Sequence, residues 1–387
     1  MHSKPPTAAC WPRVIGQQRV KEALLAARRS GRIPHAYLFH GGEGVGKDAM
    51  ALELARVLRC ERGGDEACGA CSSCERMGSL QHPDVRFVIA LPTGKGETYE
   101  DEPMAKLTDA EVRTVQEQLR LKAGNPYHRI QIARANVIKI NSIRDLRRES
   151  SMSTSDSKTR IFIISQAEAM EPPAANTLLK TLEEPPGDTM LILTTAHREA
   201  LLPTILSRCQ NVRFDPLSEA EIRGVLMERD GVGEQQAILV ARLANGSYAR
   251  ALELLQDDVM ELRRDVVDFV RKALTRNAVD LVEAVEKVAE TKDRDLALRF
   301  LTLMLMWFRD ALVLSHGGTV INLDQQADLK SFVARFPQAD LPRVMADVEK
   351  AISLVERYSY IRLVLLQLTV QLKEAILPGA GTPATPA

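Results

Sequence analysis

A short glycine-rich segment between a predicted strand and a predicted helix constrains the fold of this chain more than any other feature. The apolar run Ala36–His40 leads directly into it, and helical spacing begins at Lys47. The segment fits the pattern G-x-x-x-x-G-K, in which glycines let the backbone wrap so that its N–H groups point inward. Strand, loop and helix in this order predict a phosphate-binding loop. Its residues are Gly41, Gly42, Glu43, Gly44, Val45, Gly46, Lys47 and Asp48.

Further apolar strands alternate with helices along the first half of the chain. Strand patterns occupy Val85–Ile89, Arg160–Ile164 and Met190–Thr195. Helical patterns occupy Gln17–Arg29, Lys47–Leu58 and Ala174–Glu183. Buried strands separated by helices are typical of a parallel sheet covered on both faces. We therefore predict an α/β fold for this part.

The pattern becomes almost entirely helical after Pro216, where Ser218 and Glu221 have the spacing of a capping box. We predict one last long helix over Ala346–Leu377 and a disordered tail rich in Pro, Gly, Ala and Thr. The expected organisation is an α/β core, a small helical subdomain, a larger all-α domain and the tail, over residues 1–216, 217–257, 258–377 and 378–387.

Residues 92–136 interrupt the alternation of strands and helices. They begin with the polar loop Pro92–Glu97, and a helix then starts at the capping-box spacing of Thr108 and Glu111. We interpret this segment as a surface insertion, and its residues do not indicate a role.

Charge and hydropathy exclude several classes of protein. Lysine and arginine total 51, and aspartate and glutamate also total 51. This balance argues against a wholly basic nucleic-acid coat protein, although a local basic patch stays open. No apolar run approaches the roughly 18 residues of a membrane span, and the start lacks the apolar stretch of a secretory signal. We expect a cytoplasmic protein without membrane contact.

Four of the six cysteines fall in one short segment, at Cys60, Cys68, Cys71 and Cys74. Two C-x-x-C steps that share Cys71 suit a closed, tetrahedral four-cysteine site for structural zinc. An iron–sulfur cluster also takes four thiolates, and a metal-free cluster is the second alternative. In a chain without an export signal, this clustering favours metal over disulfides.

The glycine loop departs from an active ATPase at two places. Asp48 stands where a Ser or Thr normally binds Mg²⁺, and Ser165 and Gln166 end the strand that normally supplies acidic residues. We expect ATP binding to be weakened or altered and hydrolysis by the chain alone to be negligible. Rescue by Glu168, through a register shift, is the alternative.

The motif combination resembles the clamp-loader branch of the AAA+ proteins over about residues 12–255. The matching segments are Val14–Gln17, Pro34–Phe39, the glycine loop, the cysteine cluster, His82–Asp84, Ile143–Leu146, Ala174–Pro186 and Ile205–Cys209. The resemblance implies a RecA-like core with a zinc-module insertion and a helical lid, followed by an all-α collar domain.

Within this branch, the resemblance is to the delta-prime and gamma/tau types of DNA polymerase III subunit. The gamma/tau type keeps the Walker A hydroxyl and the acidic Walker B strand because it hydrolyses ATP, so Asp48, Ser165 and Gln166 favour the delta-prime type. An ATP-hydrolysing gamma/tau-like motor is the alternative, and a AAA+ adaptor outside replication is a weaker one.

The resemblance also implies partners and residue roles. The subunit would join gamma/tau and delta in a hetero-pentamer that opens the beta sliding clamp and sets it on primer-template DNA. Arg208 would be an arginine finger toward ATP on a neighbouring subunit, against the alternative of a structural ion pair. Thr194 and Thr195 end the strand where the family has its sensor-1 residue, and we assign that role to Thr195. Arg250 would be the sensor-2 residue. Turn-forming threonines and a solvated arginine are the plainer alternatives.

Overall fold

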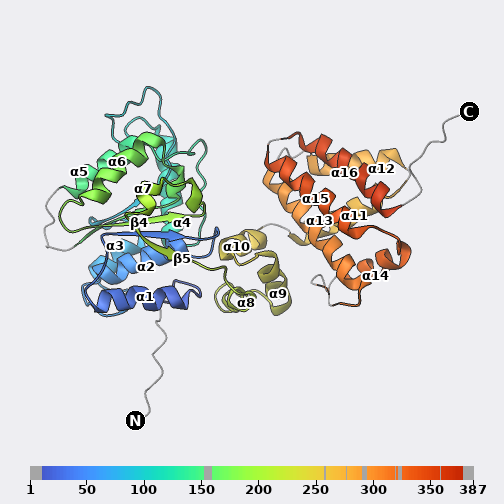
Figure 1. Ribbon diagram of the computed structural model, residues 1–387, viewed down its shortest axis with the longest axis horizontal. Helices are drawn as coiled ribbons and strands as arrows, with labels where there is room; N and C mark the ends of the chain where they lie inside the picture. Colours follow the sequence, from blue (N-terminus) through green and yellow to red (C-terminus); the bar gives the residue numbers. More distant parts are fainter. Residues whose placement is uncertain are drawn as a thin grey trace, which may run out of the picture. The chain divides into compact units, whose positions relative to one another are not determined.

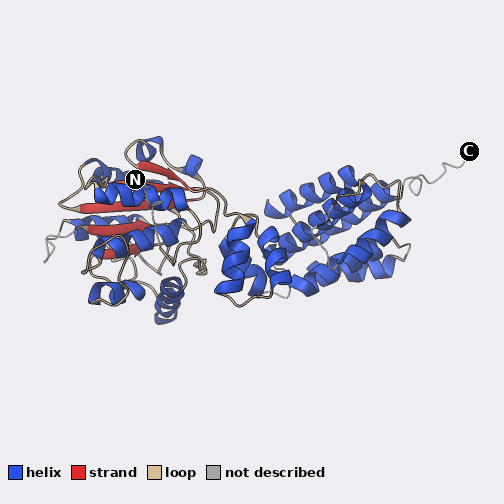
Figure 2. Cartoon of the chain, turned by 90° about the horizontal axis from the view of Figure 1, so that it is seen from below, coloured by secondary structure: helices blue, strands red, loops and turns tan. Residues whose placement is uncertain are grey.

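The buried strand patterns of the N-terminal part pair into one parallel five-stranded sheet (Figure 2). The strand order is β2-β3-β4-β1-β5, so that β1 lies between β4 and β5. The strands are β1 (Ala36–His40), β2 (Val85–Val88), β3 (Arg160–Ile164), β4 (Thr189–Thr195) and β5 (Gln210–Arg213). The computed structural model describes residues 11–151, 159–256, 259–275, 277–289, 294–318, 320, 325–357 and 359–377.

Helices cover both faces of the sheet, as the sequence predicts (Figure 1). One side carries α1 (Gln18–Arg29), α2 (Lys47–Arg59) and α3 (Ser72–Gly78), and the other carries α5 (Ile140–Ser150), α6 (Pro172–Glu183) and α7 (Pro203–Leu206). Phe162, Leu193 and Leu178 belong to one buried cluster, which joins β3 and β4 to α5 and α6. Apolar residues on both faces of these strands explain their near-continuous hydrophobic sequence.

The expected fold class is therefore confirmed, with small differences at the ends of elements. The bounds of β1 and β3 are those predicted, whereas α6 begins two residues early at Pro172, because proline is well accommodated in the first turn of a helix. The short strand β5 was not predicted, because its four residues are half-buried or exposed and show no apolar pattern.

The segment 92–136 has a small core of its own beside strand β2. It contains α4 (Asp109–Gly124), which begins with the predicted capping box at Thr108 and Glu111. Val115 on this helix is buried with Ile89 and Leu91, which follow β2. The segment is thus packed onto the α/β unit.

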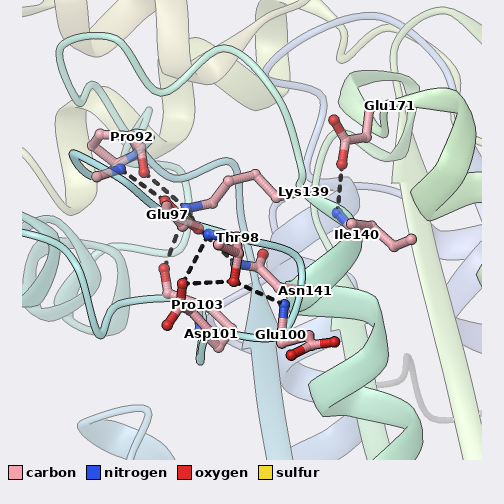
Figure 3. A network of polar contacts seen from close by, with 11 residues as sticks. Pro92, Glu97, Thr98, Glu100, Asp101, Pro103, Lys139, Ile140, Asn141 and Glu171 are labelled. Atoms are coloured by element: carbon pink, nitrogen blue, oxygen red, sulfur yellow. Dashed lines mark hydrogen bonds and ion pairs between the residues drawn. The ribbon is translucent and has the colours of Figure 1, made fainter.

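A buried ion pair fastens the beginning of this segment to helix α5 (Figure 3). Lys139 donates to the Glu97 carboxylate, which also accepts a 2.6 Å hydrogen bond from Asn141 Nδ2. Lys139 donates further to the Pro92 carbonyl at 2.9 Å. Burial alone would raise the pKa of Glu97, but the hydrogen bonds from Lys139, Gly94 N and Asn141 hold it below its ordinary value. The satisfied pair holds the polar loop in one conformation.

The chain divides into two compact units, Met1–Glu253 and Leu254–Ala387. The first unit ends with the helices α8 (Glu219–Glu228), α9 (Glu234–Leu243) and most of α10 (Tyr248–Gln256). The capping box at Ser218 and Glu221 forms as predicted and begins α8. Helices α8 and α9 pack against each other, and this group is the segment for which a lid is predicted.

The described part of the second unit is helical throughout, as expected for the all-α region. Phe269, Phe300 and Phe308 are completely buried at its centre, and Trp307 packs edge-on against Phe332 at 5.0 Å between ring centroids. In the described residues no helix unites the length and the apolar character needed to cross a bilayer. The helices are α11 (Val259–Ala273), α12 (Ala278–Ala289), α13 (Arg294–Ser315), α14 (Gln326–Arg335), α15 (Leu341–Glu356) and α16 (Ile361–Ile376).

The single long helix predicted over Ala346–Leu377 is wrong, because α15 ends at Glu356 and α16 begins at Ile361. Apolar residues on both helices face the same core, so the helical spacing continues across the break. Neither Gly nor Pro lies between the two helices to mark the turn. The predicted disordered tail, 378–387, lies outside the described residues.

Candidate functional site

The glycine loop joins the end of β1 to the first turn of α2, where a phosphate-binding loop is expected. Gly44 and Gly46 have positive φ angles of 69° and 103°. A Cβ atom at Gly44 would lie 2.0 Å from Ser247 Oγ, and one at Gly46 would lie 2.7 Å from the Tyr127 hydroxyl. Both glycines therefore permit a backbone path and a close approach that other residues would prevent.

Lys47 folds back over the loop at the start of α2. Its Nζ donates to the carbonyl oxygens of Gly41 and Gly42 at 2.8 and 2.5 Å. Burial lowers the pKa of this ammonium below its ordinary value. The ammonium thus lies against the loop backbone, at the motif position from which a P-loop lysine reaches phosphate oxygens.

Asp48 lies at the centre of a closed polar network. Its carboxylate forms a 2.8 Å ion pair with Lys122 and accepts hydrogen bonds from Ser165 Oγ at 2.9 Å and Thr194 Oγ1 at 2.7 Å. Burial alone would raise the pKa of Asp48, but the Lys122 charge and these hydrogen bonds outweigh it and lower the pKa. The carboxylate is therefore ionised, and both of its oxygens accept from donors of the protein.

The segment 92–136, whose connection with the glycine loop the sequence did not indicate, supplies Lys122 to Asp48 and Tyr127 to Gly46. Lys122, at the end of α4, is only 5% exposed and also donates to the His128 carbonyl at 3.0 Å. Tyr127 lies against Gly46, and its hydroxyl accepts a 2.8 Å hydrogen bond from the Ile15 backbone N–H. No sequence pattern relates Lys122 to Asp48, so only the fold could reveal this pair.

The start of α10 touches the loop directly. The backbone N–H of Tyr248 donates to the Gly44 carbonyl at 3.1 Å, and the Tyr248 ring packs edge-on against Tyr127. Arg250 lies in the first turn of α10, where its backbone N–H donates to Ser247 Oγ. The predicted sensor-2 residue is thus one turn of helix from the loop.

At the end of β4, neighbouring threonines point in different directions, as successive strand residues do. Thr194 reaches Asp48, whereas the Thr195 hydroxyl accepts a hydrogen bond from the His197 backbone N–H within the following turn. The structure therefore brings Thr194 into the Asp48 network and uses Thr195 in the turn.

The two residues that directly follow β3 are not acidic. Ser165 donates to Asp48, and Gln166 adopts a left-handed backbone conformation with φ of 53°. The Glu168 carboxylate, the rescue candidate, accepts a 3.0 Å hydrogen bond from the Ala196 backbone N–H. Glu168 thereby ties η1 (Ala167–Ala169) to the turn after β4.

Arg208 lies between α7 and β5, with a side chain that is 35% exposed. Its guanidinium pairs with Glu183 at the end of α6 at 2.7 Å and donates to the Thr204 carbonyl at 3.0 Å. An ion pair this exposed contributes only about 0–1 kcal/mol to stability. The side chain can therefore exchange Glu183 for another anion at little cost.

The four clustered cysteines converge, and their Sγ atoms all lie within 4.8 Å of one another. A tetrahedral zinc with Zn–S bonds of about 2.3 Å needs sulfur atoms about 3.8 Å apart, so the thiols fit zinc with small shifts. Cys60 ends α2, and Cys71 caps α3 by accepting from the Cys74 backbone N–H. Three of the four cysteines are buried.

Backbone groups favour the thiolate, the form that binds metal, at three of the four cysteines, whereas burial and the neighbouring Cys71 raise the pKa of Cys74 to about 12. A backbone hydrogen bond from Ala70 holds the pKa of Cys68 below its usual value. Burial alone would raise the pKa values of Cys60 and Cys71, but backbone N–H groups of neighbouring residues outweigh it and lower them. The donor set suits a closed structural zinc site rather than one with an open position for catalysis.

The cluster is also joined to the first helix. Asp65, in the loop between Cys60 and Cys68, pairs with Arg28 and accepts from Arg29 Nε at 3.0 Å. The Trp11 indole donates to the Asp65 carbonyl at 2.8 Å. The ordering of this loop is therefore coupled to α1.

Comparisons with known proteins agree with this architecture. The most similar relatives include DNA polymerase III subunit delta' of Bacillus subtilis, 35% identical over 62% of this chain and 60% of that protein. Subunit delta' of Escherichia coli is 26% identical over 84% of both chains. Subunit gamma/tau of Mycobacterium tuberculosis is 28% identical over 96% of this chain and 62% of that protein. The match thus spans about 60% of the length of the first of these relatives.

A family model adds the classification. The model described as DNA polymerase III, delta subunit, matches residues 16–218, which include the whole parallel sheet, the glycine loop and the cysteine cluster. This match covers more than half of the chain and agrees with the resemblance noted in the sequence. The chain therefore belongs to the DNA polymerase III delta-subunit family.

Proposed function

We propose that this chain is a delta-prime-type subunit of a DNA polymerase III clamp loader, acting as a scaffold and arginine-finger donor with little or no ATPase of its own. The observation that carries the proposal is the Asp48 network. The loop keeps its glycines and Lys47, but Asp48 and Ser165, which stand at the positions that normally bind Mg²⁺, are bonded to each other, and Asp48 also pairs with Lys122. A subunit with such a site contributes to a ring by contacting its neighbours rather than by hydrolysing ATP.

Arg208 supports the second part of the proposal. It follows α7 in the Ser-Arg-Cys triplet, and its guanidinium has a weak, half-exposed partner in Glu183. A guanidinium presents several N–H donors in a planar fork, which suits the charge that develops on a transferring phosphoryl group. We place it at the ATP of a neighbouring gamma/tau subunit.

The all-α unit supports assembly. Tyr360, Leu363 and Val370, at the start of α16 and along it, are 71%, 63% and 56% exposed. Large apolar side chains exposed along one helix are typical of surfaces that contact another protein. We assign this face to the collar contact with gamma/tau and delta in a hetero-pentamer, which would place the beta sliding clamp on primer-template DNA.

The assembly prediction is tested by co-purification. A tagged chain expressed with gamma/tau and delta should recover both subunits in a stoichiometric complex. Leu363→Asp combined with Val370→Asp should lower the recovery at least about tenfold, because charges would be buried at the interface. Met227→Asp, an equally drastic change at an exposed apolar residue of α8, is the matched control and should assemble normally. Failure of the unaltered chain to recover either subunit would refute the proposed function.

The ATPase prediction separates the proposal from its alternative, a gamma/tau-like motor. That alternative is favoured by the alignment with Mycobacterium tuberculosis gamma/tau over 96% of this chain. We expect phosphate release by the isolated chain with Mg-ATP to equal the background of a Lys47→Ala variant. Turnover that Lys47→Ala abolishes would instead identify a working motor, because only the loop lysine links that activity to this site.

A further inference from the structure

The two positions that normally hold Mg²⁺ in a P-loop site have exchanged their chemistry in this chain. The residue after the loop lysine is usually a hydroxyl, and the end of the neighbouring catalytic strand is usually an acid. Here the first is the carboxylate Asp48 and the second is the hydroxyl Ser165, which lie 2.9 Å apart. One carboxylate and one hydroxyl are thus retained, and Thr194 adds a second hydroxyl.

The cation that the Asp48 carboxylate holds is an ammonium. Lys122 Nζ lies 2.8 Å from Asp48 Oδ2 and 3.0 Å from the His128 carbonyl oxygen, and its side chain is buried. Mg²⁺ needs six oxygens at about 2.0–2.1 Å, and a second cation beside a buried ammonium is opposed by charge repulsion. The residues present therefore do not fit a nucleotide with its Mg²⁺.

We propose that Lys122 is a built-in substitute for the divalent cation of the P-loop site. The segment 92–136 thereby acquires a role: it supplies the positive charge that other P-loops take from Mg²⁺, and it keeps Mg-nucleotide out. The inference deepens the proposed lack of ATPase and rests on it. Tyr127, which bonds to the Ile15 N–H beside Gly46, anchors the same segment to the loop independently of Lys122.

Removal of the ammonium tests this assignment. In Lys122→Met, the oxygens of Asp48, Ser165 and Thr194 become available to Mg²⁺. We expect millimolar Mg²⁺ to raise the melting temperature of this variant and to tighten its binding of ADP, measured by calorimetry, at least about tenfold over the value in EDTA. Wild-type protein should show neither Mg²⁺ effect.

A matched control tests whether the Asp48 carboxylate is the group that attracts Mg²⁺. The double variant Lys122→Met with Asp48→Asn keeps the packing but lacks the charge that attracts Mg²⁺, so its melting temperature should not respond to the ion. If Lys122→Met does not fold, Lys122→Met with Asp48→Ser, neutral at both positions and with the usual hydroxyl restored, takes its place in the ADP measurement. In that measurement the ADP phosphates supply the negative charge that Asp48 no longer does, so the expected tightening by Mg²⁺ is the same.

Two results would overturn the inference. One is a wild-type chain whose stability or ADP affinity increases with Mg²⁺, because the cation position would then be open. The other is a folded Lys122→Met protein, or its replacement Lys122→Met with Asp48→Ser in the ADP measurement, that gains no response to Mg²⁺. Neither result bears on recovery of gamma/tau and delta by the wild-type chain, so the inference and the proposed assembly can fail separately.

Discussion

Replacing Arg208 by alanine is expected to lower ATP turnover at the neighbouring subunit's site in the assembled complex by about 10³-fold, the lower end of the range for arginine fingers. The guanidinium would no longer stabilise the charge that develops as the γ-phosphoryl group is transferred. Loading of the clamp on primed DNA should decline with it. When ATP is hydrolysed at several subunit sites in turn, clamp loading reports the loss at one site more directly than total ATP turnover does.

The structure indicates that this loss would not come from misfolding. Arg208 is 35% exposed and its partner Glu183 is 49% exposed, so the pair contributes only about 0–1 kcal/mol to stability. We expect the melting temperature of Arg208→Ala and its recovery of gamma/tau and delta to match the wild type. Denaturant unfolding of the isolated chain checks the first expectation, and co-purification checks the second.

Two further variants distinguish an arginine finger from an ordinary ion pair. Arg208→Lys keeps the charge but loses the planar fork, so its activity should stay close to that of Arg208→Ala. Glu183→Gln removes the ion pair while leaving the guanidinium free, so its activity should stay close to the wild type. A complex with Arg208→Ala that loads clamps at the wild-type rate would refute the role, and loss of activity in Glu183→Gln alone would point to a structural pair.

Loss of the metal from the cysteine cluster is the second large expected effect. Structural zinc is worth about 10–16 kcal/mol in small zinc-binding peptides at neutral pH, and part of that free energy would be lost from the folded state. We expect Cys71→Ser to lower the melting temperature by at least about 6 °C, since each kcal/mol shifts a domain of this size by about 2–4 °C. A strong chelator should produce a similar decrease in the wild type.

The loss of stability in Cys71→Ser should extend beyond the cysteine segment. Asp65 joins the loop between Cys60 and Cys68 to the α1 arginines, and its carbonyl accepts from Trp11. Disorder of this loop would therefore also weaken the packing of α1. Slow hydrogen exchange in α1 should become faster in Cys71→Ser, which distinguishes this coupling from a purely local effect.

Elemental analysis decides the identity of the metal. One zinc per chain is expected in protein purified without chelators, and Cys209→Ser, outside the cluster, should leave that value unchanged. Stoichiometric iron with visible absorbance would indicate an iron–sulfur cluster instead. A stable, fully folded chain without any metal would refute the site.

The sequence predicted those parts of the fold that are encoded locally. The run Ala36–His40, the glycines after it and the capping boxes at Thr108 and Ser218 each depend on neighbouring residues, and each was found where expected. The break between α15 and α16 was missed because no Gly or Pro marks it, and the apolar spacing continues through it. The direction of Thr194 was not predictable either, because β4 is buried on both faces and shows no alternation.

From the sequence alone, the only part of the candidate site that could be predicted was the glycine loop through Lys47. Strand, loop and helix are consecutive, so the glycine loop can be identified from one stretch of sequence. The ion pair between Asp48 and Lys122 joins the loop to a helix of the segment 92–136, whose path no local pattern specifies. The altered residues at Asp48 and Ser165 appeared from the sequence to be losses, whereas the fold shows them in contact with each other.

The burial of Cys209 makes the reaction of the other described cysteines with electrophiles a measure of the chain's metal content. Burial raises the pKa of this thiol to about 12, so at neutral pH almost none of it is thiolate, the form that maleimides and peroxides attack. The other four described cysteines are those of the predicted zinc site, where bound metal would protect them. Rapid alkylation of Cys60, Cys68 and Cys71, whose pKa values lie below the ordinary value, therefore counts chains that have lost their metal, while the residue beside Arg208 stays unmodified.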